Sequence, residues 1–135
     1  MKFSRQLTCH FDQCDPAGIM FYGHVFTISH QTIECFLQHI GIGWEEWFRH
    51  PTYAVPGRHS EADFTVPIRA GEKFKAVLEI TKMGKTSLSF TVTLQNEQGQ
   101  ACAVIKSAHV FVNKSDGQKA SLPSEFSERL QRYLT

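Results

Sequence analysis

The sequence contains no long apolar run. No stretch is apolar over the ~20 residues that a membrane-spanning helix requires. The N-terminus, MKFSRQLTCHFDQCD, is basic at its start but lacks the continuous apolar segment of a signal peptide. Internal repeats, low-complexity tracts and linkers are also absent. These absences predict a cytoplasmic protein, built as one domain over residues 1–135, with no membrane partner.

The chain also has little net charge. Its 14 Lys and Arg residues nearly balance 13 Asp and Glu residues, which leaves a formal charge of +1. A balance of this kind provides no bulk attraction for nucleic acid, and no glycine-rich phosphate loop is present. Hydrophobic residues make up 41% of the sequence and charged residues 20%, as is typical of a folded globular protein.

The cysteines do not form a metal-binding signature, because no CxxC pair occurs. Cys9, His10, Cys14 and His24 have a spacing that matches no zinc motif, so we expect no metal site. Cys14 precedes Asp15, whose negative charge opposes formation of a nucleophilic thiolate. Because the protein is predicted to be cytoplasmic, all four cysteines are expected to be reduced thiols; the other two are Cys35 and Cys102.

The longest helical pattern covers residues 23–40, GHVFTISHQTIECFLQHI. Its apolar seam has steps near 3.6 residues and also contains His30; the apolar members are Phe26, Ile33, Leu37 and Ile40. Gly41 and Gly43 end the helix, and a short second helix is expected at residues 44–48.

The rest of the chain is dominated by strand patterns. Strands are predicted at residues 2–11, 53–66 with an interruption near Pro56-Gly57, 74–80, 88–95 and 101–112, and a last amphipathic helix at 123–134. Short hairpin links imply antiparallel pairing. The order predicts an α+β fold in which a curved five-stranded sheet wraps around the long central helix. The outer face of such a sheet stays uncovered, which favours association between copies.

One short motif, FDQCDPAGIMFYGHV, carries the chemistry. Asp15, Pro16 and Gly18 suit the first, second and fourth positions of a type I turn. The turn leads to the start of the long helix, where the amides of Tyr22, Gly23 and His24 lack internal acceptors. An acid facing an amide-lined oxyanion site can attack a carbonyl group.

The motif DPAGIMFY, preceded by FDQC, resembles the active-site signature of the 4-hydroxybenzoyl-CoA thioesterase family, which has the hotdog fold. The resemblance spans nearly the whole chain and includes the segment ADFTVPIRAGEKF. It implies hydrolysis of an acyl-CoA thioester to a free acid and CoA, without a metal or bound cofactor. It makes Asp15 the catalytic carboxylate, either as nucleophile or as general base, and assigns the Tyr22 backbone N–H to the thioester oxygen.

The resemblance also implies a homodimer or a homotetramer, arranged as a dimer of dimers, with the pocket between subunits. In the hydroxybenzoyl enzymes a helix acid near the position of His30 meets the substrate phenol, so a histidine here departs from that pattern and counts against hydroxybenzoyl specificity. His30 is a candidate for the acyl pocket from its place on the helix seam, and Gly23, which lets a ligand approach the backbone, and His24 are the other candidate substrate contacts. Glu34 follows His30 by four residues and is expected to pair with it; in another thioesterase branch the catalytic carboxylate lies on this helix.

Basic residues near one hairpin are the candidates for the CoA phosphates. The family places such residues at the turn TKMGKTS, which selects Lys82 and Lys85, with Arg58 nearby in the strand pattern. The aromatic side chains of Phe26, Trp44 and Trp47 are expected to pack in the protein, or to line an aromatic acyl pocket.

Two other functions fit the same residues less well. A hotdog hydratase or dehydratase would use an Asp/His pair for proton transfer on the acyl chain. A non-catalytic module that binds acyl-CoA or an acyl carrier protein would not need Asp15 for affinity. The sequence favours an acyl-CoA thioesterase whose acyl group is aromatic, of the hydroxybenzoyl or hydroxynaphthoyl type, or aliphatic.

Overall fold

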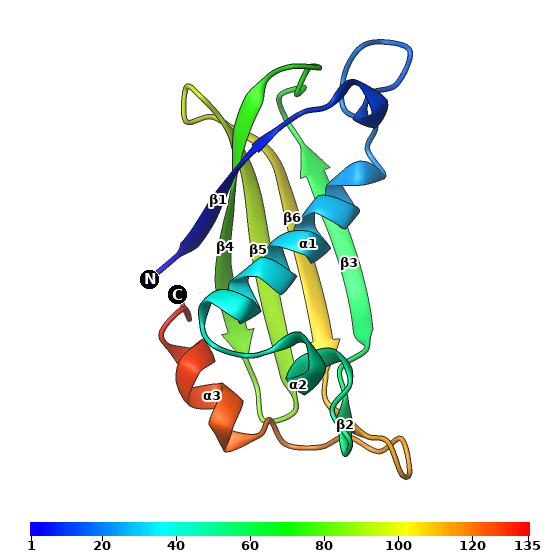
Figure 1. Cartoon of the computed structure of the whole chain (residues 1–135), viewed down its shortest axis with the longest axis vertical. Coiled ribbons are helices and arrows are strands. Elements are labelled where there is room, and N and C mark those ends of the chain that lie inside the picture. Colours follow the sequence, from blue (N-terminus) through cyan, green and yellow to red (C-terminus); the bar gives the residue numbers. More distant parts are fainter.

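A long helix lies across one face of an antiparallel sheet in the computed structural model, which describes residues 1–135 (Figure 1). The sheet has five strands in the order β1-β4-β5-β6-β3, and every neighbouring pair is antiparallel. The strands are β1 (Phe3–Thr8), β4 (Lys73–Met83), β5 (Ser87–Asn96), β6 (Ala101–Val110) and β3 (Gly57–Phe64), and the helix is α1 (His24–His39). The α+β architecture predicted from the sequence is confirmed.

The alternating pattern of the central strands builds the core. On β5, Leu88, Phe90, Val92 and Leu94 are all buried, and every second residue of β4 between positions 74 and 80 is buried as well. Because successive side chains of a strand point to opposite faces, one face of the sheet is continuously apolar and packs against α1. Burial of this face is the main favourable term that holds helix and sheet together.

The buried face of α1 differs from the predicted seam. Ile33 and Leu37 are buried as expected, but Phe26 and Ile40 are half-buried, and His30 is exposed. Two small polar residues, Ser29 and Thr32, take buried positions beside the apolar residues Val25, Ile28 and Phe36. The Thr32 hydroxyl donates to the Ile28 carbonyl at 2.7 Å, so its burial leaves no unpaired group.

The short elements correct several predicted boundaries. The first strand ends at Thr8 instead of residue 11, because the chain turns into a 3-10 segment at Phe11–Gln13. The interruption predicted near Pro56-Gly57 is confirmed, since the segment 53–66 divides into β2 (Tyr53–Ala54) and β3. The last strand, expected to be continuous, divides into β6 and β7 (Val112–Asn113). α2 (Trp44–Phe48) is confirmed, and α3 (Ser124–Gln131) is shorter than predicted.

The two edge strands of the sheet differ in exposure: β1 alternates between half-buried and exposed residues, whereas β3 is almost wholly exposed. β1 is one edge; α3 lies near the end of the sheet where the N- and C-termini meet (Figure 1). β3 is the other edge, and seven of its eight residues are exposed. A long uncovered edge strand presents unpaired backbone groups to other chains. No helix in the structure is both long enough and apolar enough to span a membrane.

Candidate active site

Asp15 occupies the first position of a tight turn, as the sequence predicts. The Gly18 N–H donates to the Asp15 carbonyl at 2.9 Å, and Gly18 has a φ of +79°. The Asp15 side chain adds a second bond, because its Oδ1 accepts the Ala17 N–H at 2.9 Å. An Asp at this position stabilises the turn and also fixes the direction of its carboxylate. One carboxylate oxygen thus holds the turn, while no hydrogen bond occupies Oδ2.

The turn is the tip of a small hairpin that is tied to the rest of the protein. The Asp15 N–H donates to the Ile19 carbonyl at 2.9 Å, and Cys14 and Met20 form an antiparallel bridge. The Met20 N–H then donates to the Ile68 carbonyl at 2.7 Å. These bonds attach the acid to the segment that follows β3, so its position depends on contacts far apart in the sequence.

The start of α1 lies a few residues after this hairpin. Gly23 is the N-cap residue of α1, and no side chain accepts a hydrogen bond from the amides at this end of the helix. The backbone N–H groups of Tyr22 and Gly23 donate to no acceptor in the chain. Free amides at this end of a helix are donors for a negatively charged oxygen, and the helix dipole has its positive end there. Two of the three predicted donors, Tyr22 and Gly23, are therefore free in the structure. The third, His24, is not, because its N–H donates to the Phe21 carbonyl at 3.0 Å.

Asp15 and Tyr22 line one cavity of about 350 Å³. Its walls are mostly apolar, and Val25 from α1 and Ala103 from β6 contribute to them. A volume of this size falls within the range of ordinary small-molecule sites. The cavity places an acid and the uncapped helix start beside an apolar compartment, which is the arrangement needed to bind and attack an acyl group.

Sequence reasoning included the segment that forms one wall of this cavity in the family resemblance but did not assign it to the site. This wall consists of the five consecutive residues 64–68, Phe64-Thr65-Val66-Pro67-Ile68, which continue from the end of β3. Phe64 is 51% exposed, which is unusual for a large aromatic side chain on a strand. A mainly apolar run at a strand end was the available signal, but it equally indicated core packing.

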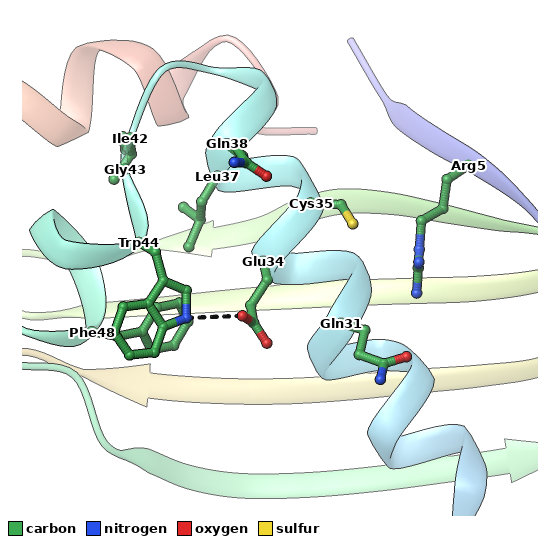
Figure 2. A pocket seen from close by; sticks show the side chains of 10 residues that line it. All are labelled: Arg5, Gln31, Glu34, Cys35, Leu37, Gln38, Ile42, Gly43, Trp44 and Phe48. Atoms are coloured by element: carbon green, nitrogen blue, oxygen red, sulfur yellow. Dashed lines mark hydrogen bonds between the residues drawn. The ribbon is translucent and has the colours of Figure 1, made fainter.

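His30 and Glu34 lie outside this cavity. They form the predicted pair, since His30 Nε2 lies 3.0 Å from Glu34 Oε2. Glu34 Oε1 also accepts the indole N–H of Trp44 at 3.0 Å, a contact that the sequence did not reveal. Figure 2 shows this bond at a second cavity, of about 450 Å³, which shares no residue with the first. Trp47 instead packs against Phe111 in the core.

A half-buried histidine lies on the sheet within electrostatic range of His30. His109 of β6 contacts the Ser107 hydroxyl at 3.0 Å and packs edge-on against Phe90. Burial, and to a lesser degree the positive charge of His30, lower the pKa of His109. The neutral imidazole is thus the favoured form in the folded protein.

The remaining predicted site residues are distributed between the two ends of the molecule. His24 begins α1 and packs edge-on against Phe21, outside the Asp15 cavity. The hairpin of Lys82 and Lys85 joins β4 to β5, at the end of the sheet opposite the loop that carries Asp15 (Figure 1). Lys82 lines a separate hollow of about 250 Å³ over the sheet, and Arg58 is exposed near the start of β3.

A family model described as the thioesterase-like superfamily matches residues 9–130. The chain is 30% identical over 133 residues to the 1,4-dihydroxy-2-naphthoyl-CoA hydrolase of Nostoc punctiforme, with 97% of this chain and 88% of that protein covered. It is 23% identical over 118 residues to the enzyme of the same name from Thermosynechococcus vestitus, with 87% and 81% covered.

Solved structures agree on the fold. A 1,4-dihydroxy-2-naphthoyl-CoA thioesterase from Synechocystis superposes with a TM-score of 0.90 at 20% identity, covering 97% of this chain and 96% of that one. A Staphylococcus aureus protein solved in complex with CoA gives a TM-score of 0.89 at 17% identity, covering 98% and 84%. From the match over most of its length and the helix-wrapping sheet, the chain belongs to the thioesterase-like superfamily of hotdog-fold thioester hydrolases.

Proposed function

We propose that this protein hydrolyses an aromatic acyl-CoA of the 1,4-dihydroxy-2-naphthoyl type, with Asp15 as the essential carboxylate. The observation that carries the proposal is the shared cavity of Asp15 and Tyr22 at the uncapped start of α1. The substrate class rests on the relatives described above, two of which are 1,4-dihydroxy-2-naphthoyl-CoA hydrolases from Nostoc punctiforme and Thermosynechococcus vestitus. The apolar walls of the cavity suit a flat aromatic acyl group.

The reaction needs a negative charge on one side of the thioester carbonyl and donors on the other. The free N–H groups of Tyr22 and Gly23 donate hydrogen bonds to the developing oxyanion. The Asp15 carboxylate either attacks the carbonyl carbon, which gives a mixed anhydride and releases the CoA thiolate, or removes a proton from an attacking water. In both routes one water is consumed, and the products are the free acid and CoA.

A second copy of the chain completes the site in this proposal. Lys82 and Lys85 lie at the end of the sheet remote from Asp15, so one chain does not bring them to the same part of the substrate. The exposed edge strand β3 runs between these ends and continues into the cavity wall at Phe64. Pairing of two β3 edges about a two-fold axis therefore joins the cavity of one subunit to the surface of the other.

The remaining predicted contacts belong to this assembled site. We assign the CoA phosphates to Lys82, Lys85 and Arg58, all of which are exposed and free to meet an anion. We assign His30, oriented by Glu34, to a hydroxyl group of the acyl ring. A histidine held by a carboxylate presents its other ring nitrogen in a fixed direction, which suits recognition of a phenol.

The test is thiol release from a panel of acyl-CoAs by the wild type and by Asp15→Asn. The panel contains benzoyl, hydroxybenzoyl, dihydroxynaphthoyl, and short and long aliphatic thioesters. Asn keeps an oxygen that can accept the Ala17 N–H, so the turn is retained while the negative charge is lost. We expect the dihydroxynaphthoyl thioester to be hydrolysed fastest, and kcat of Asp15→Asn to fall by ~10²–10⁴-fold.

Asp12→Asn is the matched control, because Asp12 is an exposed acid three residues earlier with no side-chain hydrogen bond. It should keep wild-type turnover. Binding of acyl-CoA by both the wild type and Asp15→Asn, with no hydrolysis by either, would refute the proposal and indicate a binding module. Hydration of an unsaturated acyl-CoA without thiol release would instead indicate a hydratase.

A further inference from the structure

Two cysteine thiols meet directly beside the acid. The Sγ atoms of Cys9 and Cys14 lie 3.6 Å apart, and both thiols are directed toward the His10 carbonyl. Cys9 is buried, and Cys14 is half-buried. Only four residues separate them, and Cys14 is bonded through the backbone to Asp15. Neither thiol has a role in the hydrolysis described above.

The two cysteines belong to different anchored segments. The Cys9 N–H donates to the Glu72 carbonyl, and the Gly71 N–H donates to the Cys9 carbonyl, both at 2.8 Å. Cys9 is thereby fixed to the turn that precedes β4. Cys14 belongs instead to the stem of the Asp15 hairpin, where it forms the bridge to Met20. A bond between the two sulfurs would couple the acid-bearing hairpin to that turn.

We propose that Cys9 and Cys14 are a thiol pair that a hydroperoxide oxidises to a disulfide, and that this disulfide switches the Asp15 site off. The regulatory part rests on the proposed function of Asp15. A disulfide requires a sulfur separation of ~2.05 Å, so the sulfurs must approach by about 1.5 Å from their present contact. The hydrogen bonds of Cys9 hold its backbone, and the hairpin stem at Cys14 is the part that moves.

The oxidation balances in two steps. Cys14 is the more accessible thiol and attacks the peroxide, although the neighbouring Asp15 carboxylate disfavours its thiolate and slows this step. The O–O bond breaks, and the products are a sulfenic acid on Cys14 and an alcohol, or water when the oxidant is hydrogen peroxide. The Cys9 sulfur then displaces the hydroxyl group from Cys14, which forms the S–S bond and releases water. Burial, followed by contact with the Cys14 thiol, raises the pKa of Cys9 to about 12. Cys9 is thus the resolving thiol and not the first to react.

A displaced acid loses its alignment with the thioester carbonyl. Misplacement of a reacting group by about 1 Å can lower a rate by ~10²-fold. The oxidised enzyme should therefore lose about 10²-fold in kcat and regain it after treatment with dithiothreitol. The amide NMR signals of Gly18, which donates to the Asp15 carbonyl, and of Asp15, which donates to the Ile19 carbonyl, should shift on oxidation whether or not turnover is measured.

The experiment treats the whole protein with hydrogen peroxide, alkylates the free thiols and digests with chymotrypsin. Cleavage after Phe11 falls between the two cysteines, so their fragments stay joined only through a disulfide. We expect joined fragments in the wild type and in Cys35→Ser, whose cysteine lies on α1. We expect none in Cys14→Ser or Cys9→Ala, and Cys14→Ser should keep its own untreated kcat in peroxide.

Three results would overturn the proposal: no joined fragments in the wild type, joined fragments with unchanged kcat and unchanged amide signals, or an equal loss of activity in Cys14→Ser. Cys14→Ser replaces a half-buried thiol, so it keeps the test valid if Cys9→Ala does not fold. A reduced wild type without thioesterase activity refutes the proposed function, whereas the joined fragments and the amide shifts still decide whether the thiol pair forms a bond that moves the turn.

Discussion

Phe36 anchors the central helix, and its removal should destabilise the whole fold. Its side chain is fully buried at 0% exposure. The ring packs against Tyr133 with centroids 4.8 Å apart, against Phe3 at 5.8 Å and against Phe90 at 6.2 Å. One side chain thus joins α1 to β1, to β5 and to the C-terminal segment.

The expected cost follows from this burial. Phe→Ala substitutions in a closed core cost ~3–5 kcal/mol, because transfer free energy is lost and a cavity remains. Three aromatic neighbours on separate elements limit collapse of the cavity, so we expect Phe36→Ala to reach the upper half of that range. With a urea m-value of about 2 kcal/mol/M, the unfolding midpoint should fall by roughly 2 M.

Urea unfolding followed by circular dichroism measures this change, with Phe11→Ala as the control. Phe11 is 86% exposed in the 3-10 segment, so its removal should change the free energy of unfolding by less than about 0.5 kcal/mol. A loss below about 1 kcal/mol for Phe36→Ala, or equal losses for the two variants, would refute the assignment of Phe36 as the central packing residue.

Three further predictions concern the site and its surroundings. A Cβ on Gly23 would lie 2.8 Å from Phe21 Cε2, beside the free amides, so Gly23→Ala should lower kcat toward the ~10²-fold loss expected for one oxyanion donor. The urea midpoint should change little, because the half-exposed Phe21 ring can move. Unchanged kcat would contradict the oxyanion assignment. The pKa of His109 is lowered in the folded state, so the unfolded chain binds more protons and the free energy of unfolding must fall as the pH drops below the unfolded pKa near 6.5. In urea unfolding, His109→Gln should therefore lose less stability than the wild type between pH 7.5 and pH 5.5. Equal losses in the two proteins would contradict burial of a neutral imidazole. Asp15→Asn and Lys85→Glu should each be weakly active alone, and a mixture of the two should recover about a quarter of wild-type activity. Half of the dimers in a random mixture are heterodimers, and each heterodimer has one intact site out of two. No recovery after subunit exchange would contradict a site shared between subunits.

Local patterns determined much of the fold. The alternation of residues 88–94 and the spacing of Ile33 and Leu37 predicted a buried strand and the central helix, because each period of two or 3.6 residues is a property of the backbone itself. The turn at Asp15-Pro16-Ala17-Gly18 was equally readable, since its residue preferences arise within four residues. The family resemblance, later supported by the match over residues 9–130, rested on the same short motif.

Only the tertiary structure decided what these elements bring together. The wall at Phe64 and Ile68 joins the Asp15 cavity through a hydrogen bond to Met20, a contact across almost fifty residues that no local pattern specifies. His30 satisfies the helical period of the apolar seam, yet it faces outward because Ser29 and Thr32 occupy the buried positions. The contact of Cys9 with Cys14 likewise depends on where β1 ends and how the chain turns after it. The sequence determined the elements through short-range geometry, whereas packing between distant segments determined which side chains meet.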